Sequence, residues 1–327
     1  MCLRRLRLGM GRMSVELTAD IGFLMWQTED ELFNILDDHG GGMLQAFKRK
    51  WKFKLRQYWF KNELSALKDY FGKHQLLDVL QIDPAIYLKC TRSYLWSSLN
   101  GQQRAQTQLA FYDWLLTRVS PERICEFYKA DHIVICSLPV KEQTVEVLLR
   151  PSRGLGREGE LAIFLCIDKQ VLMKASFTVL PAKLLGIEGT GRVMYVGGFQ
   201  GQRNSLELFK KTTQLMERTK PSVFMLSTLQ SLAQVWNLDG IVGSSDVTHA
   251  FASYKRTLAK RVVNSYDATW KDLGTESQTQ LNHWVLPTTW EPRPEETIES
   301  KKRSAYRRRV ALRQSFIEAC KTGIAKF

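Results

Sequence analysis

The chain has 327 residues, of which 44% are hydrophobic and 24% charged, a composition typical of a folded domain and not of a disordered chain. Its formal net charge is +14, with 47 Lys and Arg residues against 33 Asp and Glu. No apolar run approaches the ~20 residues of a membrane-spanning helix, so the sequence predicts none.

The positive charge is concentrated in two places. Residues 48–74 hold nine Lys or Arg against two acids, and residues 293–327 hold ten against four. Residues 131–200 are nearly neutral, with eight against seven. We expect these two basic poles to meet an anionic partner, such as phosphate groups, acidic lipid or nucleic acid.

The cysteines and histidines favour a reducing compartment without a metal site. The six Cys form no C-x-x-C pair, and Cys136 and Cys166 lie in apolar runs, which is typical of buried thiols in a cytoplasmic protein. The five His show no paired ligand spacing, so no zinc site is expected. Residues 1–13 are basic, with alternative starts at Met10 and Met13, and are expected to be a disordered or mis-assigned extension.

Residues 14–130 are predicted to be a helical N-terminal region. Short helices over 14–40 end at a triple glycine, a long basic helix follows, and residues 76–128 are helical again. The long helix carries an apolar stripe formed by Leu44, Phe47, Trp51, Leu55 and Tyr58, with Lys and Arg between these positions. Such a stripe usually packs into the protein's own core, which is our expectation. The alternative is that the helix lies on an anionic membrane.

From Asp131 the pattern changes, and residues 131–290 are predicted to be an α+β core. Short apolar or alternating runs predict an antiparallel meander with strands at His132–Leu138, Thr144–Leu149, Leu161–Ile167, Val171–Val179 and Arg192–Gly198. Further elements are a helix over Pro221–Trp236, a strand over Ile241–Gly243, a helix over Thr248–Leu258 and a strand over Asn282–Leu286. Residues 291–327 are expected to form a basic C-terminal helix. The fold class is thus α+β, with a mixed, mostly antiparallel sheet and flanking helices.

A glycine turn connects the fifth of these strands to the next helix. The strand is expected to break at Gly197-Gly198, and Ser205 stands where a helix N-cap would. Strand, glycine turn and helix N-terminus together can hold an anion on free backbone N–H groups. The alternative is a plain strand-to-helix turn. The anion site would consist of Gly198, Gln200, Gly201, Gln202, Arg203 and Asn204.

Several motifs in this order resemble the VirK/YbjX family of bacterial proteins. The resemblance covers roughly residues 85–320 and lies in the stretches Gly156–Leu161, Val196–Gly201, Arg218–Pro221, Ser265–Gly274 and Glu299–Arg309. The family is a domain of unknown function. Membership implies a link to virulence, envelope behaviour and resistance to antimicrobial peptides in Gram-negative bacteria.

The order of elements also resembles the plan of GNAT acyltransferases, in which the turn after the fourth strand holds the pyrophosphate of acyl-CoA. That resemblance implies a GNAT-like fold with acyl-CoA or an acyl carrier protein bound at Gln200–Asn204 and Arg203 as an added phosphate contact. A likeness of plan does not establish an activity.

Two residues are candidates for proton transfer. His249 follows the Ile241–Gly243 strand, and Glu160, with Glu158 beside it, precedes a strand after a glycine-rich loop. The commoner roles are structural for His249 and surface charge for the two acids. Tyr266, Asp267 and Trp270 form a dense polar-aromatic cluster, which a buried Tyr–Asp hydrogen-bond network would explain without a function.

The C-terminal helix supplies candidates for binding an anionic partner, namely Lys301, Lys302, Arg303, Arg307, Arg308 and Arg309. The commoner outcome is a solvated face or contact with the domain's own acids. No nucleic-acid motif accompanies them, so nucleic acid is not the expected partner.

Two hypotheses follow. One is a GNAT-like acyltransferase or acyl-CoA binder that acts on an envelope component from the inner face. The other is a non-catalytic adaptor that docks on an anionic membrane or a partner through its basic poles.

Overall fold

The structure, a computed structural model, describes residues 43–189, 191–252, 265–275 and 277–327. The α+β class is confirmed, and the described strands form one seven-stranded sheet in simple chain order. The strands are β1 (Ile133–Val140), β2 (Gln143–Pro151), β3 (Leu161–Ile167), β4 (Gln170–Pro181), β5 (Arg192–Gly201), β6 (Gly240–Gly243) and β7 (Trp284–Leu286). Neighbours are antiparallel except β5 and β6, which are parallel.

Tight turns account for the antiparallel order. Asp168 and Lys169, between β3 and β4, both have positive φ (46° and 66°), as a two-residue hairpin turn of the favoured handedness requires. The Asp168 carboxylate accepts a hydrogen bond from the Thr144 amide over 2.9 Å and so attaches this turn to β2. The parallel pair instead needs a crossover, which two helices between β5 and β6 provide.

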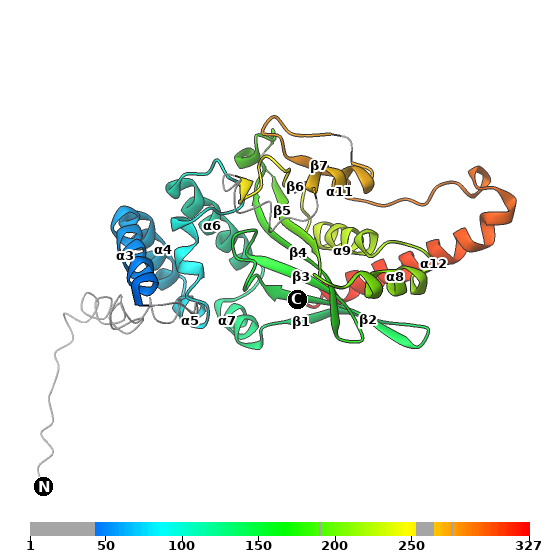
Figure 1. Ribbon diagram of the computed structural model, residues 1–327, viewed down its shortest axis with the longest axis horizontal. Helices are drawn as coiled ribbons and strands as arrows, with labels where there is room; N and C mark the ends of the chain where they lie inside the picture. Colours follow the sequence, from blue (N-terminus) through cyan, green and yellow to red (C-terminus); the bar gives the residue numbers. More distant parts are fainter. Residues whose placement is uncertain (1–42, 190, 253–264, 276) are drawn as a thin grey trace, which may run out of the picture.

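Helices precede the sheet and cover it (Figure 1). The N-terminal ones are α3 (Met43–Trp59), α4 (Lys61–Lys73), α5 (Leu77–Ile82), α6 (Gly101–Leu116) and α7 (Pro121–Ala130). The later ones are α8 (Leu206–Leu215), α9 (Pro221–Val235), α11 (Tyr266–Asp272) and α12 (Ser300–Ile324). In Figure 1, α3 lies at one end of the long axis and the first turns of α12 lie at the other.

The core is built mainly on one face of the sheet. Alternate residues of β3, such as Ile163 and Leu165, belong to the large cluster that also includes α6, α9 and α12. The residues between them, such as Phe164, form a small cluster on the opposite face. Because β3 is buried on both faces, its sequence is a continuous apolar run.

The long C-terminal helix lies directly against the sheet. α12 packs on β1 and α9, and Phe316 meets Phe224 with ring centroids 5.1 Å apart. A Cβ atom on Gly323 would lie 1.8 Å from the carbonyl oxygen of Ile135, so glycine at this position lets helix and strand backbones touch.

Two predicted features of secondary structure differ from the structure, and others lie outside the described residues. The predicted break at Gly197-Gly198 is wrong, because β5 continues to Gly201 and stays paired with β4. Residues 248–252 do not form the predicted helix; Trp96 pairs with His249 in an isolated β-bridge there. The helices expected over 14–40 and the extension 1–13 lie outside the described residues, as does most of the predicted Thr248–Leu258 helix.

Candidate functional site

Two acidic side chains from one loop enter the protein interior. Glu158 and Glu160 precede β3, and both are buried. A Cβ atom on Gly159, between them, would lie 2.5 Å from the backbone N and O of Phe177, so glycine is needed for the loop to lie this close to β4. The Glu160 amide donates to the Phe177 carbonyl over 2.9 Å. The expectation that these acids are surface charges is therefore wrong.

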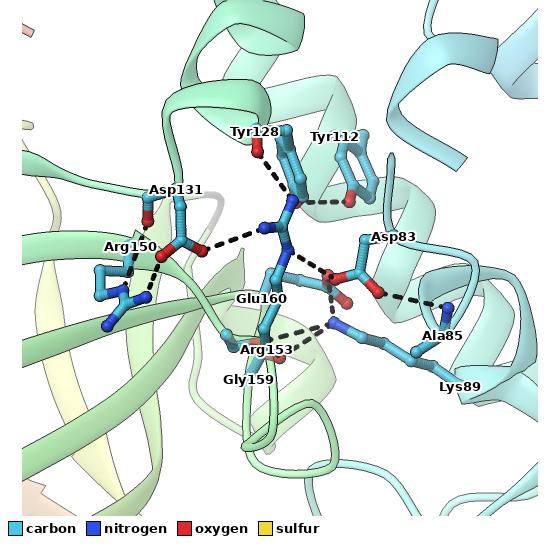
Figure 2. A network of polar contacts seen from close by, with 11 residues as sticks. Asp83, Ala85, Lys89, Tyr112, Tyr128, Asp131, Arg150, Arg153, Gly159 and Glu160 are labelled. Carbon is cyan, nitrogen blue, oxygen red and sulfur yellow. Dashed lines mark hydrogen bonds and ion pairs between the residues drawn. The ribbon is translucent and has the colours of Figure 1, made fainter. Parts of the chain in front are cut away.

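The Glu160 carboxylate forms a buried ion pair (Figure 2). The Lys89 Nζ donates to Oε2 over 2.6 Å, and the Tyr94 hydroxyl donates to Oε1 over 2.5 Å. Lys89 also donates to the Gly159 carbonyl at 3.1 Å. Burial raises the pKa of the Glu160 carboxyl, and Lys89 and Tyr94 offset part of that rise. Burial and the nearby Glu160 raise the pKa of Tyr94, so its hydroxyl keeps the proton that it donates.

Charged residues nearer the surface form further contacts beside this ion pair (Figure 2). Arg153 donates to the Tyr128 carbonyl (2.7 Å) and to Asp131 (3.1 Å), and lies 3.8 Å from Asp83. Arg150 also binds Asp131, which ends α7 with a left-handed backbone. These contacts connect α7 to β2 and to the loop after β2. Because these contacts join elements that are distant in sequence, they stabilise the fold.

The Glu158 carboxylate meets a second set of polar side chains. Its Oε1 accepts hydrogen bonds from Gln200 Nε2 (3.0 Å) and His249 Nε2 (3.1 Å), and its Oε2 lies 3.4 Å from the Ser176 hydroxyl. The Phe251 amide donates to His249 Nδ1 at 3.4 Å, which assigns the proton of the neutral ring to Nε2. The structure therefore joins His249 to Glu158 and not to Glu160, its expected companion.

This cluster lies beside the parallel pair of strands, where their carboxyl ends separate. The β5–β6 pairing stops at Val196 and Gly243, and β5 has a bulge at Gly197. In α/β sheets such a place often binds a ligand. Here the Trp270 ring occupies the space beside Gly243: a Cβ atom on that glycine would lie 2.7 Å from the ring.

Further aromatic rings pack around the point where the β5–β6 pairing stops. The His249 ring stacks on Tyr266 with centroids 4.7 Å apart, and Phe199 meets Trp270 at 4.9 Å. Trp270 Nε1 donates to the Ser244 carbonyl, and Asp267 accepts from Trp284 Nε1 (both 2.8 Å). Since both His249 nitrogens are occupied and the ring is buried, the geometry favours a structural role; its catalytic role stays a prediction.

The residues expected to hold an anion are divided between the interior and the surface. A Cβ atom on Gly198 would lie 2.4 Å from both Glu158 Oε2 and Ser176 Oγ, so a carboxylate already occupies the space in front of it. Gln200 is bound to Glu158, and Gly201 lies against the Phe209 ring, 2.9 Å from an added Cβ. Gly198 is therefore closed off by the protein's own carboxylate, whereas Gln200 and Gly201 are exposed and their contact with an anion stays a prediction.

The second half of the expected anion site is an exposed turn before α8. It consists of Gln202, Arg203 and Asn204. The Gln202 amide already donates to the Leu172 carbonyl over 2.8 Å. Ser205 occupies the N-cap position as expected, but its hydroxyl donates to the Gln202 carbonyl and caps no helix amide. Anion binding by this turn stays a prediction.

The basic pole on α12 is partly paired with the protein's own acids. Arg307 Nε donates to Glu295 over 3.0 Å, Arg308 Nε to Glu217 over 3.2 Å, and Lys302 Nζ to Glu299 over 2.9 Å. Lys301 shares Glu299 at 3.6 Å, whereas Arg303 and Arg309 donate to the uncharged Ile298 and Ala305 carbonyls. Contact with its own acids was the commoner alternative for this pole.

The basic helix α3 differs from α12 in that no acid lies within it. It carries six Lys or Arg among 17 residues. The apolar stripe that we expected in the core faces outward, with exposed fractions of 60% for Phe47, 54% for Trp51, 39% for Leu55 and 72% for Tyr58. Among residues 47–59 of α3, whose side chains the structure describes, Phe53 is buried, with 6% of its surface exposed. The expectation of a core-packed stripe is wrong for these four residues.

A family model for a protein of unknown function, DUF535, matches residues 42–322. The chain belongs to the DUF535 family. The uncharacterized protein YbjX of Escherichia coli K12 is 24% identical over 241 residues, which are 72% of this chain and 70% of that protein. These matches confirm the VirK/YbjX family expected from the sequence motifs.

Two shorter matches are to uncharacterized proteins of Haemophilus influenzae. They are 30% identical over 142 residues and 28% identical over 132 residues, or 42% and 39% of this DUF535 chain. The matched segments span 43% of the length of each relative. No solved structure matches the chain, so its likeness to GNAT acyltransferases stays a prediction. Within the described residues, no helix is both long enough and apolar enough to cross a bilayer.

One histidine that the sequence reasoning missed is buried in this DUF535 fold without a hydrogen-bond partner. His283 is fully buried, and neither ring nitrogen is bonded in the described structure. Its ring lies 5.2 Å from the Tyr195 ring and 5.5 Å from the Trp96 ring, centroid to centroid. Burial lowers the pKa of His283 to about 4, because a charged imidazolium would lack both water and an acceptor.

We expect His283 to make the protein acid-labile. Between pH 6.5 and about 4 the unfolded state binds a proton at this position and the folded state does not, so stability falls as pH falls. The loss should reach roughly 2 kcal/mol between pH 7.5 and pH 5. His283→Leu should remove that share, as measured by urea denaturation at the two pH values. Equal pH dependence in variant and wild type would contradict this.

Proposed function

We propose that this DUF535 protein is a non-catalytic docking protein that associates with an anionic partner through α3. The observation that carries the proposal is the combination on one helix of six basic residues, no acid, and an exposed apolar stripe. A helix that carries bases and no acids of its own creates a positive potential that attracts anionic surfaces. A large exposed apolar face usually marks a site of interaction with a protein, a ligand or a membrane.

Two further observations favour docking over catalysis. The α12 pole, which is as basic in sequence, contacts Glu217, Glu295 and Glu299, whereas α3 has no acid of its own. The polar clusters around Glu158 and Glu160 are buried and bonded among themselves, as expected of groups that hold a fold together. These observations favour α3 as the docking element and give the buried clusters a structural role.

A variant of α3 that lacks charge tests the proposal. We expect Lys48→Gln/Lys52→Gln/Arg56→Gln to lower affinity for heparin, used as a generic polyanion, at least tenfold, because each base near an anionic surface contributes ~1 kcal/mol. Elution salt from a heparin column gives the measurement.

The matched control removes three charges from the other pole as Lys301→Gln/Lys302→Gln/Arg308→Gln. Its elution should shift less than that of the α3 variant, because it removes the same number of charges away from the proposed docking helix. Equal shifts in the two variants would show that only net charge matters, and no shift in the α3 variant would exclude α3 as the docking element.

A second candidate function is an acyl-CoA binder of GNAT-like plan. One observation favours it: β5 and β6 are parallel, are joined by helices, and separate beyond a bulge at Gly197. We place the phosphate contact of that candidate at the exposed turn Gln202–Asn204. Calorimetric titration with acetyl-CoA tests it, and a lack of binding heat with the folded wild-type protein would exclude it.

A further inference from the structure

The exposed side chains of α3 form a continuous stripe along the helix. Phe47, Trp51 and Leu55 are four residues apart, and Tyr58 follows Leu55 after three, so all four lie on one face. Trp59, at the end of the helix, is also exposed, at 68%. Phe53 projects from the opposite face and is the buried contact of α3 with the body of the protein. The helix thus exposes its wider apolar face.

Lysines border this stripe on both sides. At about 100° per residue, Lys48 and Lys54 lie roughly 60° on either side of the stripe's midline. Lys48 and Lys52 are exposed, and long lysine side chains can extend past an apolar face while keeping the ammonium in water. A helix with aromatic residues on one face and lysines along its borders is the pattern of helices that lie in the plane of a membrane interface.

We propose that α3 docks on a lipid bilayer with anionic headgroups, with Phe47, Trp51, Leu55 and Tyr58 inserted among the acyl chains and Lys48 and Lys52 at the headgroups. This inference rests on the proposed function and names its partner. Charge complementarity selects anionic lipid over neutral lipid. Trp and Tyr have an apolar body and a polar tip, which suits the boundary between headgroups and chains.

A bilayer fits the stripe better than a nucleic acid does. Bases would stack on the aromatic rings but leave Leu55 without a matching contact, whereas acyl chains accept all four side chains. The stripe also runs from Phe47 to Tyr58 along the 17-residue helix, which is about 25 Å long. In Figure 1, α3 lies at one end of the long axis, and its stripe residues Phe47, Trp51 and Tyr58 are each more than half exposed.

Vesicle flotation tests the inference with a variant that keeps every charge. Wild-type protein should float with phosphatidylcholine vesicles that contain phosphatidylglycerol and stay behind with phosphatidylcholine alone. Phe47→Gln/Trp51→Gln/Tyr58→Gln should lower the bound fraction at least tenfold while eluting from heparin as wild type does. The control Val134→Gln/Leu206→Gln/Val247→Gln removes exposed apolar side chains elsewhere and should float normally.

The outcomes separate this inference from the proposed function. If wild type binds heparin through α3 but no vesicle, the partner is another polyanion, such as nucleic acid, and the inference is overturned. Flotation of the stripe variant equal to wild type would overturn it too. If light scattering shows that wild type is a dimer and the stripe variant a monomer, a second copy of the chain covers the stripe. If wild-type protein binds neither heparin nor vesicles, the proposed function itself is overturned.

Discussion

Replacing Lys89 with Met is expected to destabilise the protein by roughly 3–5 kcal/mol, the cost of leaving a buried charge without its partner. The Lys89 Nζ lies 2.6 Å from Glu160 Oε2, and both side chains are almost completely buried. Without the ammonium, Glu160 keeps only the Tyr94 hydroxyl among these charge-stabilising donors. Urea or thermal unfolding followed by circular dichroism gives the measurement.

Two controls show whether the unpaired charge causes this loss. Lys89→Met/Glu160→Gln should recover at least half of it, because a neutral amide oxygen still accepts from Tyr94. The defect of Lys89→Met should also shrink as pH falls, since a folded-state carboxyl pKa raised by burial means that the folded state takes up a proton before the unfolded state does. A loss below about 1 kcal/mol, or none recovered by the double variant, would contradict this account.

Gly323→Ala is expected to cost roughly 3 kcal/mol through overpacking, although alanine favours helices by ~1 kcal/mol over glycine. The new Cβ would lie 1.8 Å from the Ile135 carbonyl oxygen, far below the 3.0 Å that real Cβ contacts keep. The obstacle is strand backbone, which cannot rotate away as a side chain can. α12 would have to move off β1, loosening the buried Phe316 and Cys320.

Gly72 in α4 provides the matched control. Its nearest neighbour to an added Cβ is Leu77 Cδ1 at 3.9 Å, an ordinary contact. Gly72→Ala should therefore stabilise the protein by up to ~1 kcal/mol, opposite in sign to Gly323→Ala. Equal effects at the two positions, measured by the same denaturation assay, would show that α12 does not need this close approach.

Local patterns in the sequence were sufficient to predict most of the sheet. The five predicted meander strands all exist, because alternating or continuous apolar runs bounded by turn residues depend on local chemistry. β5 is the exception at its end: a glycine pair is a common break signal, yet here it makes room for the Glu158 backbone and carboxylate. That requirement comes from a loop almost 40 residues earlier, which no local pattern contains.

The site depends still more on distant contacts. Glu158 and His249 are 91 residues apart, and Lys89 and Glu160 are 71 apart, so neither pairing has a signal in local spacing. For α3, periodicity identified the apolar stripe correctly but could not tell whether it faces the core or solvent. The absence of acids among its many bases was the one unusual local feature, because lysines beside an apolar stripe also occur on helices that face the interior.

Hydrogen–deuterium exchange with and without phosphatidylglycerol vesicles tests the central claim, docking through α3, most directly. We expect amides within Met43–Trp59 to become protected when vesicles are added, while those of Ser300–Arg309 in α12 exchange at an unchanged rate. Unchanged exchange in Met43–Trp59 with the protein bound to vesicles, or new protection confined to α12, would contradict the claim.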